Sequence, residues 1–143
     1  MIDIFFEEIS PLAELNPDFY ESWLDQVASL EKKKLGDISL IFTSDEHLLT
    51  VNQQYLDHDY YTDIITFPLN DADSKTVDSE LYISIDRIAD NAKKHKVEFK
   101  HELFRVIFHG VLHLIGYNDK TAKQEKAMRA KEDEWLKLFY QSA

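Results

Sequence analysis

Two histidines in an apolar stretch carry the clearest sign of chemistry in this chain. His109 and His113 lie between Leu103 and Ile115, in a run that is nearly all apolar and contains no proline. This run predicts a buried helix, because it is longer than a typical strand. Residues four apart lie on one face of a helix, so the two imidazoles should stack one turn apart.

A glycine and an acid follow this expected helix. Gly116 can adopt the left-handed conformation that ends a helix, so the chain can fold back and bring Asp119 toward the histidines. Two neutral imidazoles and a carboxylate form a zinc-type ligand set that leaves a fourth position for water. The alternative is that His109 and His113 are ordinary core or surface histidines. Because burying two unpartnered imidazoles is costly, we predict a metal site.

The residue after the first histidine bears on the class of enzyme. Zinc peptidases of the His-Glu-x-x-His kind need a glutamate there as general base, whereas this chain has Gly110. This difference argues against that class of peptidase. A residue without a side chain would instead allow the helix to approach a neighbouring strand or a substrate closely.

Length and composition set the expected size and environment of the protein. The chain has 143 residues, of which 44% are hydrophobic, so we expect a single domain spanning residues 1–143. It has no cysteine and a formal net charge of −11, which lowers the expectation of nucleic-acid binding without forbidding a local basic patch. No apolar run is long enough for a membrane span, and the N-terminal segment lacks the features of a signal peptide, so we expect a cytoplasmic protein without a membrane partner.

The remaining elements follow from periodicity and turn residues. A capping box of Thr43 and Glu46 predicts the start of the second helix, and a polar exposed loop is expected over residues 70–79. The third and fourth strands would follow each other directly, which predicts a mixed sheet covered by helices. We expect strands over residues 2–6, 38–42, 62–67 and 81–85. Helices are expected over 17–30, from the cap at Thr43 to 56, over 86–96, from 98 or 100 to 115, and over 121–140.

Three segments resemble the YbeY family of bacterial rRNA-maturation endoribonucleases. The run His109-Gly110-Val111-Leu112-His113-Leu114-Ile115-Gly116-Tyr117 is similar to the core of the family's metal motif, in which three histidines are separated by three and five residues. Asn52-Gln53-Gln54-Tyr55 and residues 62–68 are similar to two upstream family segments. The resemblance implies a small α+β domain, with a mixed four-stranded sheet, about five helices and a zinc site at the end of a buried helix.

Two departures from the family pattern concern the expected site. The family's third histidine falls on Asp119, which still suits zinc but lowers the net charge of the site, so the bound water should be less acidic. The basic residue that follows the family's tyrosine is replaced by Leu56. His58 or Arg105 could take its catalytic or phosphate-binding role, although each is more typical of a surface or helix-packing residue.

These observations favour a metal-dependent endoribonuclease that cuts single-stranded RNA in rRNA maturation and ribosome quality control, with RNA and the ribosome or ribosomal proteins as partners. Arg105, Arg87 and the Lys93–Lys100 cluster could hold the RNA backbone, or the cluster could be a solvated helix end. Two alternatives remain: a metal-dependent amidase or peptidase with another base, and a ribosome-associated binding module with a structural metal.

Overall fold

The computed structural model describes residues 2–9, 25, 29, 32–57, 62–70 and 75–142, with side chains up to residue 138. The helix expected over residues 17–30 lies outside the described residues, apart from two isolated positions. The elements are β1 (Ile2–Phe6), β2 (Lys34–Thr43), α2 (Asp45–Leu56), β3 (Ile64–Pro68), β4 (Thr76–Ser84), α3 (Ile85–His95), α4 (Phe99–Leu114) and α5 (Ala122–Ser142).

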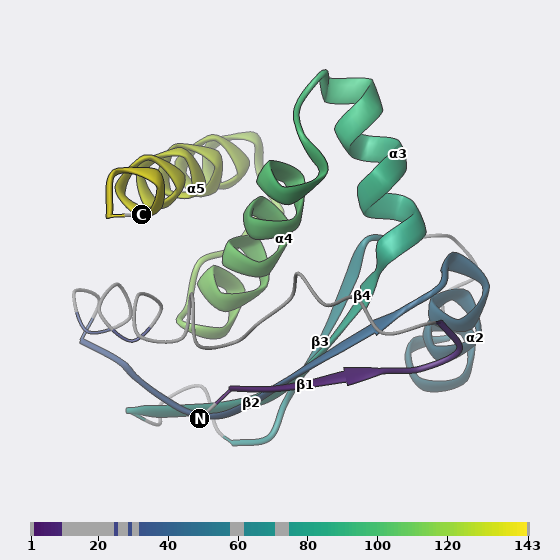
Figure 1. The fold of residues 1–143 in the computed structure, drawn as a ribbon. Coiled ribbons are helices and arrows are strands. Elements are labelled where there is room, and N and C mark those ends of the chain that lie inside the picture. The colour runs from purple at the N-terminus through teal and green to yellow at the C-terminus, as the bar shows by residue number, and fades with distance from the viewer. Residues whose placement is uncertain are drawn as a thin grey trace.

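The four strands form one mixed sheet in the order β1-β2-β4-β3 (Figure 1). β1 and β2 are parallel, as are β2 and β4, whereas β3 runs antiparallel to β4. The antiparallel pair follows from the short connection between β3 and β4, because a parallel pair needs a long crossover. The expected α+β class and mixed four-stranded sheet are confirmed, and β3 is left as an edge strand beside α4.

The main core lies between the sheet and α4. Alternate residues of β4, including Leu81 and Ile83, point to this face and are fully buried. Gly110 allows the close approach, because a Cβ there would lie 2.6 Å from Leu81 Cδ2 and 2.7 Å from Ile64 Cδ1. The expectation that Gly110 permits tight contact with a strand is therefore confirmed.

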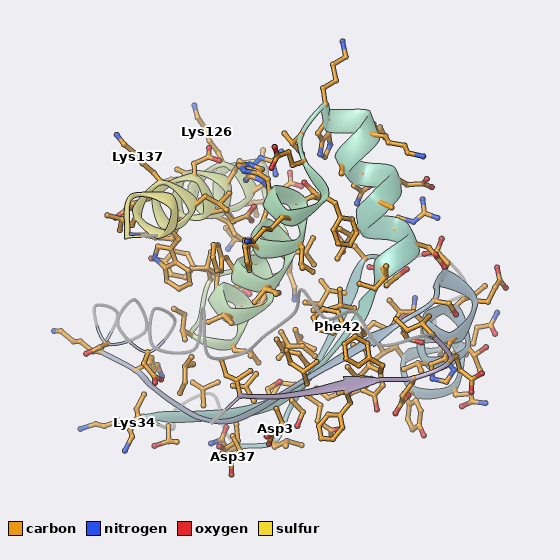
Figure 2. The ribbon with its side chains drawn as sticks, in the orientation of Figure 1. Asp3, Lys34, Asp37, Phe42, Lys126 and Lys137 are labelled. Atoms are coloured by element: carbon orange, nitrogen blue, oxygen red, sulfur yellow. The ribbon has the colours of Figure 1, made fainter. Side chains whose placement is uncertain are left out.

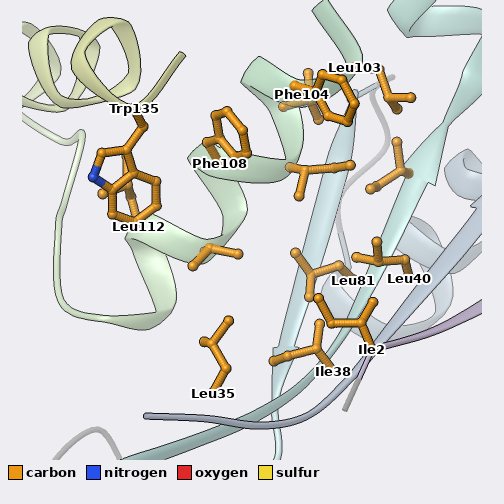
Figure 3. Packing of buried hydrophobic residues seen from close by; sticks show 14 of the residues in the cluster. Ile2, Leu35, Ile38, Leu40, Leu81, Leu103, Phe104, Phe108, Leu112 and Trp135 are labelled. Carbon is orange, nitrogen blue, oxygen red and sulfur yellow. The ribbon is translucent and has the colours of Figure 1, made fainter. Parts of the chain in front are cut away.

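Helix α5 covers the other side of α4. Its Trp135 ring lies edge-on against Phe108, with ring centroids 6.1 Å apart (Figure 3). Met128 and Leu136 of the same helix are buried in the same core cluster. This contact fixes one face of α5 against the helix that carries the two histidines. None of the helices in the described part of the chain is long and apolar enough to cross a membrane.

Two local expectations were wrong. The N-cap of α2 is Ser44, which accepts a hydrogen bond from the backbone N–H of His47, whereas the hydroxyl of Thr43 donates to the carbonyl of Glu7. Thr43 is fully buried at the end of β2, so it is not available as a cap. The polar segment 70–79 is not a loop from Thr76 onward, where it pairs with β2, and Asn70 Nδ2 donates to the Thr76 carbonyl at 2.6 Å.

Candidate metal centre

Helix α4 brings the two histidines together on one face. The helix begins after Glu98 and continues through an apolar run that is buried between the sheet and α5. The rings of His109 and His113 lie with centroids 4.7 Å apart at an interplanar angle of 86°. The two histidines thus share one helix face as predicted, and because both side chains are partly exposed, the pair faces outward from the core.

The end of α4 directs the chain back toward these rings. Gly116 has φ of +116°, and its N–H donates to the carbonyl of His113 at 3.2 Å. The N–H of Tyr117 donates to the carbonyl of Leu112 at 3.0 Å, which completes a Schellman motif with Gly116 at the left-handed position. The reversal brings Asp119 against the histidines, as the sequence predicted.

The three side chains have the spacing of a metal-ligand set. Asp119 Oδ2 lies 3.5 Å from His109 Nε2 and 3.3 Å from His113 Nε2, and the three ligand atoms all lie within 4.8 Å of one another. Zinc bonds of about 2.0–2.2 Å in a tetrahedron separate neighbouring ligand atoms by about 3.3–3.6 Å. A divalent ion therefore fits between these atoms without a change of fold.

Hydrogen bonds to the other ring nitrogens orient both imidazoles. His113 Nδ1 lies 3.1 Å from the carbonyl of Tyr117, which can only accept, so Nδ1 carries the proton. His109 Nδ1 lies 2.7 Å from the carboxylate oxygen Oε2 of Glu132, so this Nδ1 also carries the ring proton. Both Nε2 atoms are thus left as lone-pair donors that face Asp119, as in known metal sites whose ligands are held by outer partners.

Glu132 of α5 contacts the candidate centre, and the sequence did not predict it. Its side chain is only 4% exposed, and besides His109 it contacts Arg105, whose Nη1 donates to Oε1 at 3.1 Å. A signal was present, because Met128, Glu132 and Leu136 recur every four residues on one face of α5. An acid in such a buried stripe needs a partner, and here the partners are His109 and Arg105.

The charges around His109 set its protonation when no metal is present. Burial lowers the pKa of His109, but the hydrogen bond and the charge of Glu132, together with Asp63 and Asp119, outweigh it, so the pKa is raised above 6.5. Burial raises the pKa of Asp63, while His109 partly opposes that shift. A half-buried carboxyl group therefore lies beside the three candidate metal ligands without being one of them.

Two cavities meet at the metal centre and form one cleft. The first, of about 460 Å³, lies among α3, α4 and α5, and the second, of about 370 Å³, lies among α2, β3 and α4. Asp63, His109 and Asp119 line both. Because the two cavities share these residues, a long substrate could cross the centre from one to the other.

The structure places the other candidate residues differently. Arg105 borders the first cavity, but its guanidinium is engaged by Glu132 and by Asp133, whose Oδ1 accepts from Nη2 at 2.6 Å. These ion pairs and hydrogen bonds raise the pKa of Arg105 despite its burial. His58 lies outside the described residues, so its role stays a prediction.

The expected basic contacts are sparse around the cleft. Arg87 donates to Asp45 Oδ2 at 2.8 Å and lines neither cavity. Within the fully described segment Lys93–Lys100, only His95 lines the cleft. Two α5 residues add positive charge to the first cavity, Arg129 and Lys126, the latter extending outward from the helix (Figure 2). Leu56, which replaces the family's basic residue, lines the second cavity.

We expect Asp119, and not Asn118, to be the third ligand, because its carboxylate oxygen already lies 3.3 Å from His113 Nε2. Asp119→His should retain metal, whereas Asp119→Ala should lower metal affinity by more than about tenfold, since even the loss of an outer partner has that effect. Competition with a chelator measures this. Asn118→Ala is the matched control, and greater damage from it than from Asp119→Ala would contradict the assignment.

The chain is similar in sequence and in fold to known proteins. A family model described as endoribonuclease YbeY matches residues 8–140. Proteins named endoribonuclease YbeY include that of Cytophaga hutchinsonii, 50% identical over 117 residues that make up 82% of this chain and 81% of the relative. That of Porphyromonas gingivalis is 43% identical over 96% of this chain and 90% of its own. The solution structure of TM1509 from Thermotoga maritima superposes with a TM-score of 0.71 at 26% identity, over 99% of this chain and 91% of that one.

Proposed function

Because this chain belongs to the endoribonuclease YbeY family, we propose that it is a zinc-dependent enzyme that cuts single-stranded RNA during rRNA maturation and ribosome quality control. The observation that carries the metal dependence is the convergence of His109, His113 and Asp119 at the meeting point of two cavities. RNA is the substrate, the ribosome or its proteins are the partners, and the cytoplasm is the place of action.

The chain's residues would hold the ion and the reacting groups. A zinc ion bound there supplies Lewis acidity, which lowers the pKa of water and neutralises charge that develops on a phosphate oxygen. Glu132 and the carbonyl of Tyr117 fix the two imidazoles, so the ligands need no rearrangement. Asp63 is suited to take and return a proton at the edge of the cleft, because burial raises its pKa toward the working range.

The surroundings of the centre argue against a structural metal and against a peptidase of the His-Glu-x-x-His kind. A structural metal is normally enclosed by four protein ligands, whereas the group in the described part of the chain has three partly exposed ones. A peptidase of the His-Glu-x-x-His kind needs a glutamate where this chain has Gly110. A side chain at that position would collide with Leu81 and Ile64, so the fold leaves no room for that base.

The charge of the protein bears on how it holds RNA. With a formal net charge of −11, affinity for isolated RNA should be weak and sensitive to salt. Arg129 and Lys126 supply positive charge along the first cavity, but Glu125 and Glu102 line it as well. A ribosomal partner that contributes cations would compensate for this acidic charge, which is consistent with a role on the ribosome.

We expect the wild-type protein to cleave single-stranded rRNA fragments and to leave a casein-type substrate intact. A chelator should stop RNA cleavage by removing the ion, and added zinc should restore it. Gel analysis of both substrates with and without chelator measures this. RNA cleavage that is indifferent to the chelator would contradict metal dependence, and chelator-sensitive proteolysis would favour a peptidase instead.

A further inference from the structure

A groove with an aromatic lining lies on the α2 side of the sheet, and neither the metal centre nor the cleft includes it. It has a volume of about 390 Å³, and we call it the aromatic groove. Its wall is formed by the last turns of α2, the end of β3 and the neighbouring part of β4. The lining residues are Val51, Tyr55, Phe67, Pro68, Leu69, Glu80 and Tyr82.

Three rings in the groove form a connected aromatic cluster. Phe67 lies edge-on to Tyr82, with ring centroids 5.6 Å apart, and edge-on to Tyr55 at 6.0 Å. Although Tyr55 makes this contact, it is 69% exposed. Phe67 and Tyr82 thus hold an aromatic ring at the surface, where a flat ligand can stack on it.

The aromatic groove continues the second half of the cleft. On α2, Asn52 and Leu56 line the cleft, and their neighbours Val51 and Tyr55 line the groove. Along β3, residues up to Thr66 line the cleft and the next residues line the groove. The strand carries the chain from Asp63 beside the metal ligands to Phe67, a rise of about 13 Å at 3.3 Å per residue. A short extended strand of nucleic acid can cover this distance over the β3 edge.

The chemistry of the lining selects a base over a phosphate. None of the described residues that line the groove is a lysine or an arginine, so it offers no counter-charge to a phosphate. Glu80, which pairs with Phe67 across β3 and β4, places a carboxylate beside the rings. A carboxylate accepts hydrogen bonds from exocyclic amines of bases, and aromatic side chains stack on unpaired bases of single-stranded RNA.

We propose that the aromatic groove binds one unpaired base of the RNA whose backbone crosses the metal centre, with Tyr55 as the stacking platform and Glu80 as the acceptor for an amine-bearing base. This inference rests on the proposed function. The Glu80 acceptor should make the groove bind adenine and cytosine in preference to uracil, since uracil has no exocyclic amine. Continuity with the cleft favours RNA as the occupant over a protein segment.

The test measures binding of labelled adenosine, cytidine and uridine oligomers of about ten nucleotides, a length within the range that single-strand binding domains cover. Protein from which a chelator has removed the metal is used, so that the oligomers are not cleaved during the measurement. The anisotropy of the label gives the affinity. Tyr55→Ala should weaken binding of the adenosine oligomer by roughly 5- to 150-fold, the range for loss of one stacked base, whereas Tyr55→Phe should retain it. Glu80→Gln should reduce the preference for adenosine and cytidine over uridine.

The matched control is Phe5→Ala, which removes another half-exposed aromatic ring from β1, at the opposite edge of the sheet from β3. It should leave binding unchanged. Equal binding by Tyr55→Ala and wild type, or an equal loss in Phe5→Ala, would overturn the proposal. So would a Tyr55→Ala variant that keeps RNA affinity but loses binding to ribosomal subunits, because the occupant would then be a protein. Loss of all metal-dependent cleavage in the wild type would instead refute the proposed function, so the two failures are distinguishable.

Discussion

Replacing His113 with alanine should remove both the bound metal and RNA cleavage. Among the described residues, His113 is one of the three that the proposed site would offer to a metal, and its Nε2 lies 3.3 Å from the carboxylate of Asp119. Loss of an outer partner of a metal ligand alone lowers affinity or activity by about 10- to 100-fold, so loss of a ligand should exceed about a hundredfold. Elemental analysis and the cleavage rate measure the two effects on the same preparation.

His101→Ala is the matched control for this variant. His101 lies on the same helix, near its start, and lines neither cavity of the cleft. The His101→Ala variant should therefore retain both metal binding and RNA cleavage. RNA cleavage that persists equally in His113→Ala and wild type would indicate a contaminating nuclease and would count against the proposed function.

Replacing Glu132 with alanine should lower metal affinity by about 10- to 100-fold, although Glu132 is not one of the proposed ligands. The carboxylate holds His109 through a 2.7 Å contact to Nδ1, and its loss frees the ring to rotate and to change tautomer. It also removes the buried partner of Arg105. Glu132→Gln should have a smaller effect, since its amide oxygen still accepts from Nδ1. Titration with zinc against a chelator gives the affinities.

Glu132 should also control how the metal-free protein responds to pH. Because the folded pKa of His109 is raised, its charge stabilises the fold fully below the unfolded value of about 6.5, and this stabilisation disappears as the pH rises through the raised pKa. Glu132→Gln should reduce this dependence, because it removes the negative charge that raises the pKa. Chemical unfolding of chelated protein across this pH range measures the difference.

Asp133→Asn is the matched control for the Glu132 variants. Asp133 is the next residue on α5 and binds the same guanidinium, with Oδ1 2.6 Å from Arg105 Nη2, but it is largely exposed. Its substitution should leave metal affinity nearly unchanged. If Asp133→Asn weakens metal binding as much as Glu132→Ala, the effect comes from Arg105 and not from the orientation of His109.

The sequence by itself determined the local part of the metal centre. The apolar run and the four-residue spacing placed His109 and His113 on one helix face, because side chains repeat with the period of the backbone. Gly116 determined where the helix ends, since it adopts a positive φ that other residues avoid. Asp119 follows so closely that the reversal alone brings it to the histidines. The motif around these residues also indicated the family before any tertiary contact was known.

Only the tertiary structure decided which distant residues support that centre. Glu132 lies 23 residues beyond His109, and its hydrogen bond exists only because α5 packs on α4 through Trp135 and Phe108. The same packing engages Arg105 with Glu132 and Asp133, whereas the sequence left open whether Arg105 binds a phosphate or packs against a helix. The approach of α4 to β3 at Gly110 likewise sets the walls of the cleft. Helix periodicity fixes the direction of a side chain relative to its own backbone, but the partner it meets depends on how whole elements pack around the core.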